Sequence, residues 1–160
     1  MKKSVVILCL LSTLVACSSN KKDKLAEVSP SLYELPETVD YDKAARINVE
    51  LGLNYLKQGQ IARAKAKFTR AKKLAPHLPE VHYSVAYFQE QVGEIMEAEK
   101  SYQKAISLRP KGGNEHNNYG VFLCRQQQFK KAEKEFLKAI EDQTYPNTAE
   151  ALENAGLCVL

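Results

Sequence analysis

Apolar residues recur every three or four positions from about residue 40 onward, a spacing that is typical of amphipathic helices and not of strands. Ala64, Ala98 and Ala132 lie 34 residues apart and mark the same point in three successive segments. Each is followed four residues later by an aromatic residue and seven residues later by a second alanine, namely Phe68, Tyr102 and Phe136, and Ala71, Ala105 and Ala139. The pattern therefore predicts a repeated pair of helices.

The first helix of the first pair has two candidate N-caps, Asp40 and Asp42, and is predicted to end near Lys57. Gly59 then makes the turn, and the partner helix is predicted over residues 61–74. A glycine suits this turn because it adopts the left-handed conformation that ends a helix without steric cost.

The same turn recurs one and two periods later. Gly93 holds the place of Gly59, whereas the third turn is Gln126-Gln127-Gln128 and contains no glycine. We expect this substitution to cost about 1 kcal/mol, which is too little to abolish the third pair.

A 34-residue period with small residues at a helix crossing and an aromatic residue one turn later is the pattern of the tetratricopeptide repeat (TPR). The small residue lets two antiparallel helices approach closely, and the aromatic ring fills the remaining gap. The predicted fold is an all-α TPR solenoid of about three and a half repeats. The predicted repeats are 45–78, 79–112 and 113–148, with a two-residue insertion in the last loop, followed by a partial repeat at 149–160.

Residues 155–160 are apolar and look like the interior of a repeat. Because TPR arrays normally close with a polar-faced helix, we expect either that the sequence is truncated relative to a functional relative or that this segment packs on another surface.

The amino-terminal segment resembles a bacterial lipoprotein signal. Lys2 and Lys3 precede an apolar stretch, residues 5–15, that is too short to span a bilayer, and small residues then lead directly into Cys17. The order of these features favours a lipoprotein signal peptide over residues 1–16 and acylation of Cys17. The alternative is an ordinary secretory signal with a chance cysteine.

The residue after this cysteine is Ser18 and not the aspartate that retains such proteins at the inner membrane of enteric bacteria. The resemblance therefore implies a lipid anchor in the outer membrane, facing the periplasm. Residues 17–39 are polar and then proline-containing, and are predicted to be a lipidated tether to a TPR domain at 40–160.

The formal charge of +4 falls to +2 once the two lysines of the signal are removed, because that segment contains no acidic residue. A net charge this small does not predict nucleic-acid binding. Five cations are nevertheless clustered in the second helix, and we interpret them as its solvated face and not as a polyanion site: Lys65, Lys67, Arg70, Lys72 and Lys73.

No enzyme signature is present: the sequence has no glycine-rich phosphate loop, nucleophile elbow, HExxH or CxxC. We therefore predict no catalytic activity, cofactor, metal or small-molecule substrate. His82 and His116 lie 34 residues apart at a packing position of the repeat, which favours burial over metal binding. Carboxylates on helices beside lysines are expected to form solvated ion pairs: Glu97, Glu99, Glu133 and Glu135.

Two of the four cysteines, Cys124 and Cys158, fall within the predicted repeats. Both lie on first helices of successive repeats, which run side by side in a solenoid. In an oxidising periplasm we favour a disulfide over two buried free thiols, and the bond would hold the last helix in place.

The inner, concave face is the predicted partner-binding surface, because five positions of each first helix lie on one side at helical spacing. They are Arg46, Val49, Leu53, Leu56 and Lys57; Glu80, Tyr83, Tyr87, Glu90 and Gln91; and Asn114, Asn117, Val121, Cys124 and Arg125. Apolar and aromatic residues with a polar rim suit a peptide. The alternative is that Tyr83 and Tyr87 only pack between repeats. Val49 and Leu53 stand where chaperone-associated TPRs place the first Lys and Asn of a carboxylate clamp, so that clamp is absent.

Three segments carry a resemblance beyond the repeat: 48–59 (NVELGLNYLKQG), 117–124 (NNYGVFLC) and 151–158 (ALENAGLC). With the lipobox, they make the chain similar to the type IV pilus biogenesis and stability lipoproteins of the PilW (PilF) family. The resemblance implies a non-enzymatic outer-membrane scaffold or pilotin that binds secretin or other pilus-assembly proteins. The alternative function is a general periplasmic TPR adaptor in envelope assembly unrelated to pili.

Overall fold

The computed structural model describes residues 40–159, and the predicted signal peptide, Cys17 and tether lie outside them. Within these residues there are seven α-helices and no strand. The helices are α1 (Tyr41–Lys57), α2 (Ile61–Leu74), α3 (Pro79–Gln91), α4 (Ile95–Leu108), α5 (Gly113–Arg125), α6 (Phe129–Glu141) and α7 (Thr148–Val159).

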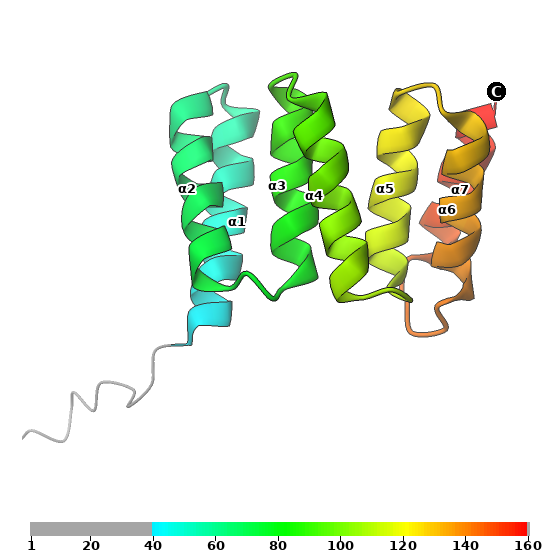
Figure 1. The fold of residues 1–160 in the computed structure, drawn as a ribbon, viewed down its shortest axis with the longest axis horizontal. Coiled ribbons are helices and arrows are strands. Elements are labelled where there is room, and N and C mark those ends of the chain that lie inside the picture. The colour runs from blue at the N-terminus through cyan, green and yellow to red at the C-terminus, as the bar shows by residue number, and fades with distance from the viewer. Residues whose placement is uncertain (1–39, 160) are drawn as a thin grey trace, which may run out of the picture. The chain divides into compact units, whose positions relative to one another are not determined.

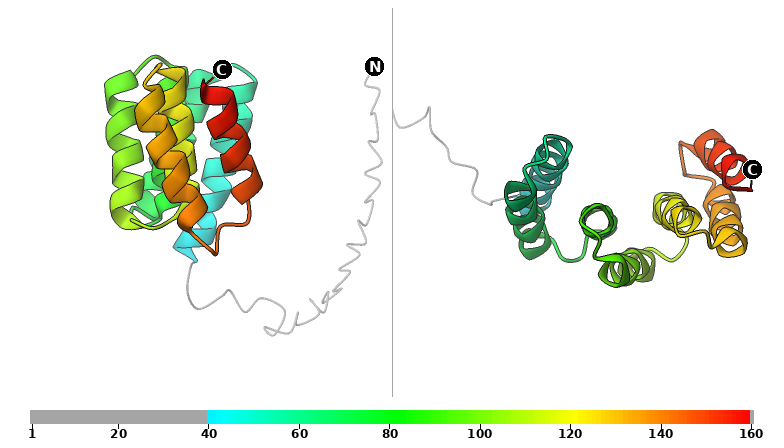
Figure 2. Two further views of the ribbon diagram at one scale, coloured as in Figure 1. Left: turned by 90° about the vertical axis from the view of Figure 1, so that its right-hand side faces the viewer. Right: turned by 90° about the horizontal axis from the view of Figure 1, so that it is seen from above.

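The helices of residues 40–159 form two layers. Figure 1 shows α1 packed beside α2, α3 beside α4 and α5 beside α6, each pair joined by a tight turn. The first helices α1, α3, α5 and α7 contact one another in order and lie on the inside of the curve seen from above in Figure 2, with α2, α4 and α6 outside. The predicted all-α solenoid of helix pairs is therefore confirmed.

The ends of the first helices follow local sequence. The Asp40 side chain caps α1 by accepting a hydrogen bond of 2.8 Å from the backbone N–H of Lys43, which selects it over Asp42 as the N-cap. The turns after α1 and α3 place Gly59 and Gly93 at φ 70° and 82°. Gln127 takes the same left-handed conformation, φ 60°, at the corresponding point of the third turn.

Close helix crossings explain the 34-residue pattern. Ala64, Ala98 and Ala132 are fully buried, and the aromatic residue one turn after each is buried beside it. On the facing helices, a Cβ added to Gly52 would lie 2.9 Å from Cζ of Phe68, and one added to Gly120 would lie 2.7 Å from Cε1 of Phe136. The aromatic rings therefore occupy the space that a larger side chain would need.

The loop between α6 and α7, where the sequence predicts an insertion, is tied to α5. Asp142 accepts a hydrogen bond of 2.8 Å from the backbone N–H of Gly113, and the Tyr145 ring is buried against that glycine. The Thr144 hydroxyl, the N–H of Gly113 and the N–H of Thr144 lower the pKa of Asp142 to about 2. The loop is thus an ordered part of the third repeat.

None of α1 to α7 combines the length and the hydrophobicity that crossing a bilayer requires.

Candidate partner-binding face

The predicted concave-face residues all lie on α1, α3 and α5, in the inner layer of helices. Side-chain bonds cross from each of these helices to the next. These bonds decide which side chains remain available to a partner.

Two arginine–glutamate pairs join neighbouring first helices. Nη2 of Arg46 on α1 lies 2.8 Å from Oε1 of Glu80 on α3, and both side chains are partly open to solvent. Nε and Nη2 of Arg125 on α5 each donate a hydrogen bond of 2.6 Å to Glu90 on α3. The Glu90 side chain is only 6% exposed, and its hydrogen bonds raise the pKa of Arg125. These four predicted rim charges therefore pair with each other across the repeats.

The middle of the face contains both buried and accessible groups. Asn117 is buried and accepts a hydrogen bond of 3.1 Å from Asn154 on α7, so its side-chain oxygen is engaged within the protein. Tyr83 is half-buried against the central core, and burial, together with Glu80 and Glu115, raises its pKa to about 12. Tyr87 is 38% exposed. The two tyrosines thus differ: Tyr83 packs between repeats, and Tyr87 is open to a partner.

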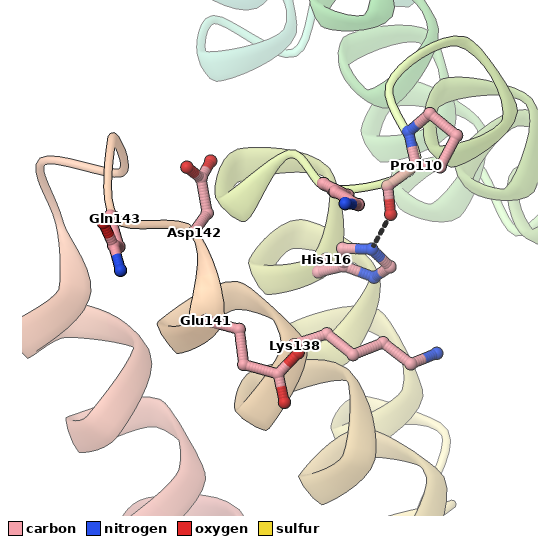
Figure 3. A pocket seen from close by; sticks show the side chains of 7 residues that line it. Pro110, His116, Lys138, Glu141, Asp142 and Gln143 are labelled. Atoms are coloured by element: carbon pink, nitrogen blue, oxygen red, sulfur yellow. Dashed lines mark hydrogen bonds between the residues drawn. The ribbon is translucent and has the colours of Figure 1, made fainter.

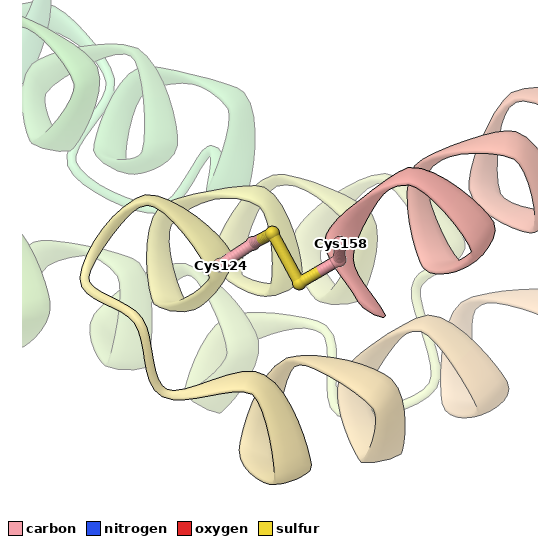
Figure 4. Close-up of a disulfide and its surroundings, with 2 residues drawn as sticks. All are labelled: Cys124 and Cys158. Atoms are coloured by element: carbon pink, nitrogen blue, oxygen red, sulfur yellow. A yellow bond between two sulfur atoms is a disulfide. The ribbon is translucent and has the colours of Figure 1, made fainter. Parts of the chain in front are cut away.

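A disulfide joins Cys124 of α5 to Cys158 of α7, with their Cα atoms 5.6 Å apart (Figure 4). It crosses between first helices, as the two ion pairs do. A hollow of about 130 Å³ lies beside it, lined in part by Val121, Asn154 and Leu157. The disulfide is therefore part of the wall of the predicted binding face.

The two repeat histidines are buried and bound to the backbone. Nε2 of His82 lies 2.7 Å from the carbonyl oxygen of Pro76, and Nε2 of His116 lies 2.9 Å from that of Pro110. Each imidazole thus donates to the loop that precedes its own helix. Among residues 40–159, no three side chains that could ligate a metal converge.

The expectation that Glu135 and Glu99 form solvated ion pairs is wrong in part. Oε2 of Glu135 lies 2.6 Å from Nδ1 of buried His116, although its other oxygen does bind Lys138. Glu99 accepts a hydrogen bond of 3.1 Å from the Tyr119 hydroxyl. Helical spacing identified their lysine neighbours but not the groups presented by the adjoining helix.

A cavity of about 500 Å³ lies at the start of α5, close to the end of α6 (Figure 3). Its polar side chains include His116, which binds the Pro110 carbonyl, and Asp142, which binds Gly113. Lys138, also at its edge, binds Glu135. His116, Asp142 and Lys138 are therefore already engaged in contacts within the repeat.

Glu115 is a buried group that the sequence analysis missed. Its side chain is 1% exposed, and Oε2 has no hydrogen-bond partner within the described residues, Nε of Arg109 being 3.9 Å away. Burial raises the pKa of this carboxyl. Gly112 is the sequence feature that accompanies this burial, because a side chain at position 112 would collide with the Glu115 carboxylate.

Comparison with known proteins agrees with this geometry. The tetratricopeptide repeat family matches residues 45–78 and 79–111. PilF of Pseudomonas aeruginosa is similar with a TM-score of 0.67 and 30% identity over 74% of this chain and 53% of PilF. PilW, described as a widely conserved type IV pilus biogenesis factor, is similar with a TM-score of 0.65 and 29% identity over 71% of this chain and 52% of PilW.

The first TPR domain of Spaghetti (RPAP3), solved with an HSP90 peptide, gives a TM-score of 0.60 at 21% identity over 74% of this chain and 92% of that domain, which supports the fold alone. No curated protein matches the sequence. The chain spans about half the length of PilF and PilW. The matched repeats and the helix-pair geometry together show that the chain contains tetratricopeptide repeats and has a TPR solenoid fold similar to the structures of PilF and PilW.

Proposed function

We propose that this protein is a non-enzymatic scaffold for type IV pilus biogenesis, anchored by lipid at Cys17 to the periplasmic side of the outer membrane. One observation carries the proposal beyond a generic TPR protein. The two family-like segments 117–124 and 151–158 lie on different helices and meet through the Cys124–Cys158 disulfide. A second link between these segments is the Asn154–Asn117 hydrogen bond.

The proposed mechanism is a pilot mechanism in which no covalent bond changes. Acylation of Cys17 concentrates the TPR domain at the membrane, and the inner face holds a segment of the secretin or of another pilus-assembly protein. Membrane and partner then meet at a high effective concentration.

The accessible part of the inner face defines the chemistry of the partner. Tyr87 is exposed, and Leu53 and Leu56 are partly so. Lys57 and Gln91 lie exposed at the rim, while the charges of Arg46 and Arg125 are paired. A peptide that buries apolar side chains near Tyr87 and needs few ionic contacts fits this surface.

The proposal is tested by deleting the gene and probing outer membranes for heat-resistant secretin multimers, with wild-type and Cys17→Ala copies restored. Lost multimers that only the wild-type copy rescues support the secretin pilot. Normal multimers with missing or unstable pili move the role to the fibre. No effect on either supports the general envelope adaptor and overturns the pilus assignment.

A matched pair of variants tests which face is used. Tyr87→Asp places a charge on the inner face, whereas Met96→Asp places the same charge on outer helix α4, where Met96 is 74% exposed. We expect Tyr87→Asp to abolish rescue and Met96→Asp to retain it. Equal rescue by both variants would remove Tyr87 from the proposed binding surface.

A further inference from the structure

A second groove lies away from the inner face, at the junction of α2 with α3. It encloses about 430 Å³, and its floor is formed by the apolar side chains Phe68, Val85 and Phe88. Its rim carries three lysines of α2: Lys65, Lys72 and Lys73. None of these residues belongs to the predicted concave face.

The next junction in the same protein shows what fills such a groove. Tyr119 lies 34 residues after Val85 and therefore has the same position in its own repeat. Its ring stacks on Phe122 with the centroids 6.0 Å apart, and it lies 6.0 Å from the Tyr102 ring. At the α4–α5 junction the chain therefore supplies its own aromatic side chain.

The polar end of that tyrosine is also informative. The Tyr119 hydroxyl donates a hydrogen bond of 3.1 Å to Glu99, and the residue at the repeat position of Glu99 in the first repeat is Lys65. The α2–α3 junction thus lacks the aromatic ring and has a cation where the other junction has a carboxylate. A ligand that fills it should supply a ring and negative charge.

The charge of α2 supports the same conclusion. This helix contains six cations and no acidic residue: Arg63, Lys65, Lys67, Arg70, Lys72 and Lys73. None of the ion pairs formed within residues 40–159 involves α2. At the groove itself, three lysines face one carboxylate, that of Glu94.

From these observations we propose that the α2–α3 groove is a docking site for an acidic protein segment with a central aromatic residue. The aromatic side chain enters the space that Tyr119 fills at the next junction. Flanking carboxylates contact Lys65, Lys72 and Lys73. The recess between α2 and α3 favours such a segment over an anionic lipid surface, which could contact the lysines but could not place a ring against Phe68 and Val85. The site is distinct from the inner face and does not depend on the proposed pilus role.

The test uses the purified protein and the peptide acetyl-Glu-Glu-Phe-Glu-Glu-amide in an NMR titration. We expect shifts at Phe68, Val85 and Phe88. Replacing the peptide phenylalanine with alanine should weaken binding at least about tenfold, because it removes the buried ring.

Two protein variants separate groove binding from general charge attraction. The double variant Lys65→Glu/Val85→Tyr reproduces the side chains of the α4–α5 junction, so the repeat can accommodate it, and it should weaken binding at least about tenfold. Arg70→Glu makes the same charge change as Lys65→Glu on the same helix but outside the groove lining, and should alter binding less than about threefold.

Three outcomes overturn the proposal. Equal weakening by Arg70→Glu and by the double variant indicates non-specific charge attraction. Binding of phosphatidylglycerol vesicles that is as strong in the double variant as in the wild type, without peptide shifts in the groove, makes α2 a lipid-contact surface. Absence of groove shifts at millimolar peptide removes the site. If the double variant does not fold, Val85→Tyr alone is compared with Arg70→Glu.

Discussion

Arg125 and Glu90 form a two-pronged ion pair between consecutive repeats, with both hydrogen bonds at 2.6 Å. Because the Glu90 side chain is only 6% exposed, Arg125→Ala leaves a nearly buried carboxylate without its partner. We expect the free energy of unfolding to fall by about 2 kcal/mol in urea denaturation.

The matched control for this prediction is Arg46→Ala, which breaks the solvent-exposed pair with Glu80. Its cost should stay below about 1 kcal/mol. Equal costs for the two variants would show that burial of Glu90 does not set the strength of the Arg125 pair.

Gly120→Ala places a methyl group against the buried Phe136 ring. We expect a loss of about 1–3 kcal/mol, measured by urea unfolding. Gly156→Ala is the control, because it lies within α7 and its added Cβ meets no atom within 4 Å. That change should be neutral or stabilise the protein by up to about 1 kcal/mol, since alanine is the better helix former. A stable Gly120→Ala protein would argue against close packing of α5 on α6.

Gln127→Gly should stabilise the protein by about 0.5–1 kcal/mol, because Gln127 holds φ at 60°, where glycine has no steric cost. The reciprocal change at the preceding turn, Gly93→Gln, should destabilise by a similar amount. Thermal melts of both variants check the prediction. Changes of the same sign in the two melts would contradict it.

The pKa values of His82 and His116 should be shifted in opposite directions from 6.5. Burial lowers the pKa of His82 from 6.5, whereas at His116 the effect of burial is outweighed by hydrogen bonds to Glu135 and to the Pro110 carbonyl, which raise the pKa. The difference arises because Ser101 stands in the second repeat where Glu135 stands in the third. Imidazole NMR signals followed against pH measure both values directly.

The two shifts affect stability with opposite signs. His116 contributes fully to the free energy of unfolding below pH 6.5, and this contribution is lost as pH rises through the raised pKa of the folded state. The contribution of His82 is present above pH 6.5 and is lost as pH falls through the lowered pKa of the folded state. In Glu135→Gln the His116 contribution should disappear, so that stability increases from about pH 6 to about pH 8. An unchanged pH profile in Glu135→Gln would contradict the role assigned to this carboxylate.

The Cys124–Cys158 bond closes a loop across a sequence separation of 34. We expect periplasmically expressed protein to contain the bond, and mass spectrometry without reductant to find no free thiol at either position. Reduction should lower the free energy of unfolding by about 2–4 kcal/mol, because it releases the constraint on the unfolded chain. A Cys124→Ala/Cys158→Ala variant should melt like the reduced protein and should not respond to reductant.

The helices could be predicted from the sequence because the residues that specify them are close together and periodic. Helix α2, for example, begins at Ile61 and ends at Leu74 as expected, since its alanines and Phe68 recur at helical spacing. Contacts between helices were harder to predict, because they depend on which side chain a neighbouring element presents. Glu135 binds His116 from 19 residues away, and Tyr145 of the α6–α7 loop is buried against Gly113.

Contacts within the candidate partner-binding face were equally hard to predict from the sequence. Helical geometry placed Glu90 and Arg125 on the inner layer, but it did not reveal that they bind each other. It also gave no sign that Val85 leaves open the space that Tyr119 fills one repeat later, because both residues are ordinary apolar choices for that position.

The disulfide between α5 and α7 also affects the order in which the array opens. Solenoid repeats usually lose structure one after another from an end, since each unit contacts only its neighbours. With Cys124 bonded to Cys158, the end of α7 stays tethered to α5, so that α7 cannot leave the array by itself. Amide hydrogen exchange should therefore be fastest in α1 and α2, and reduction of the bond should shift the fastest exchange to α7.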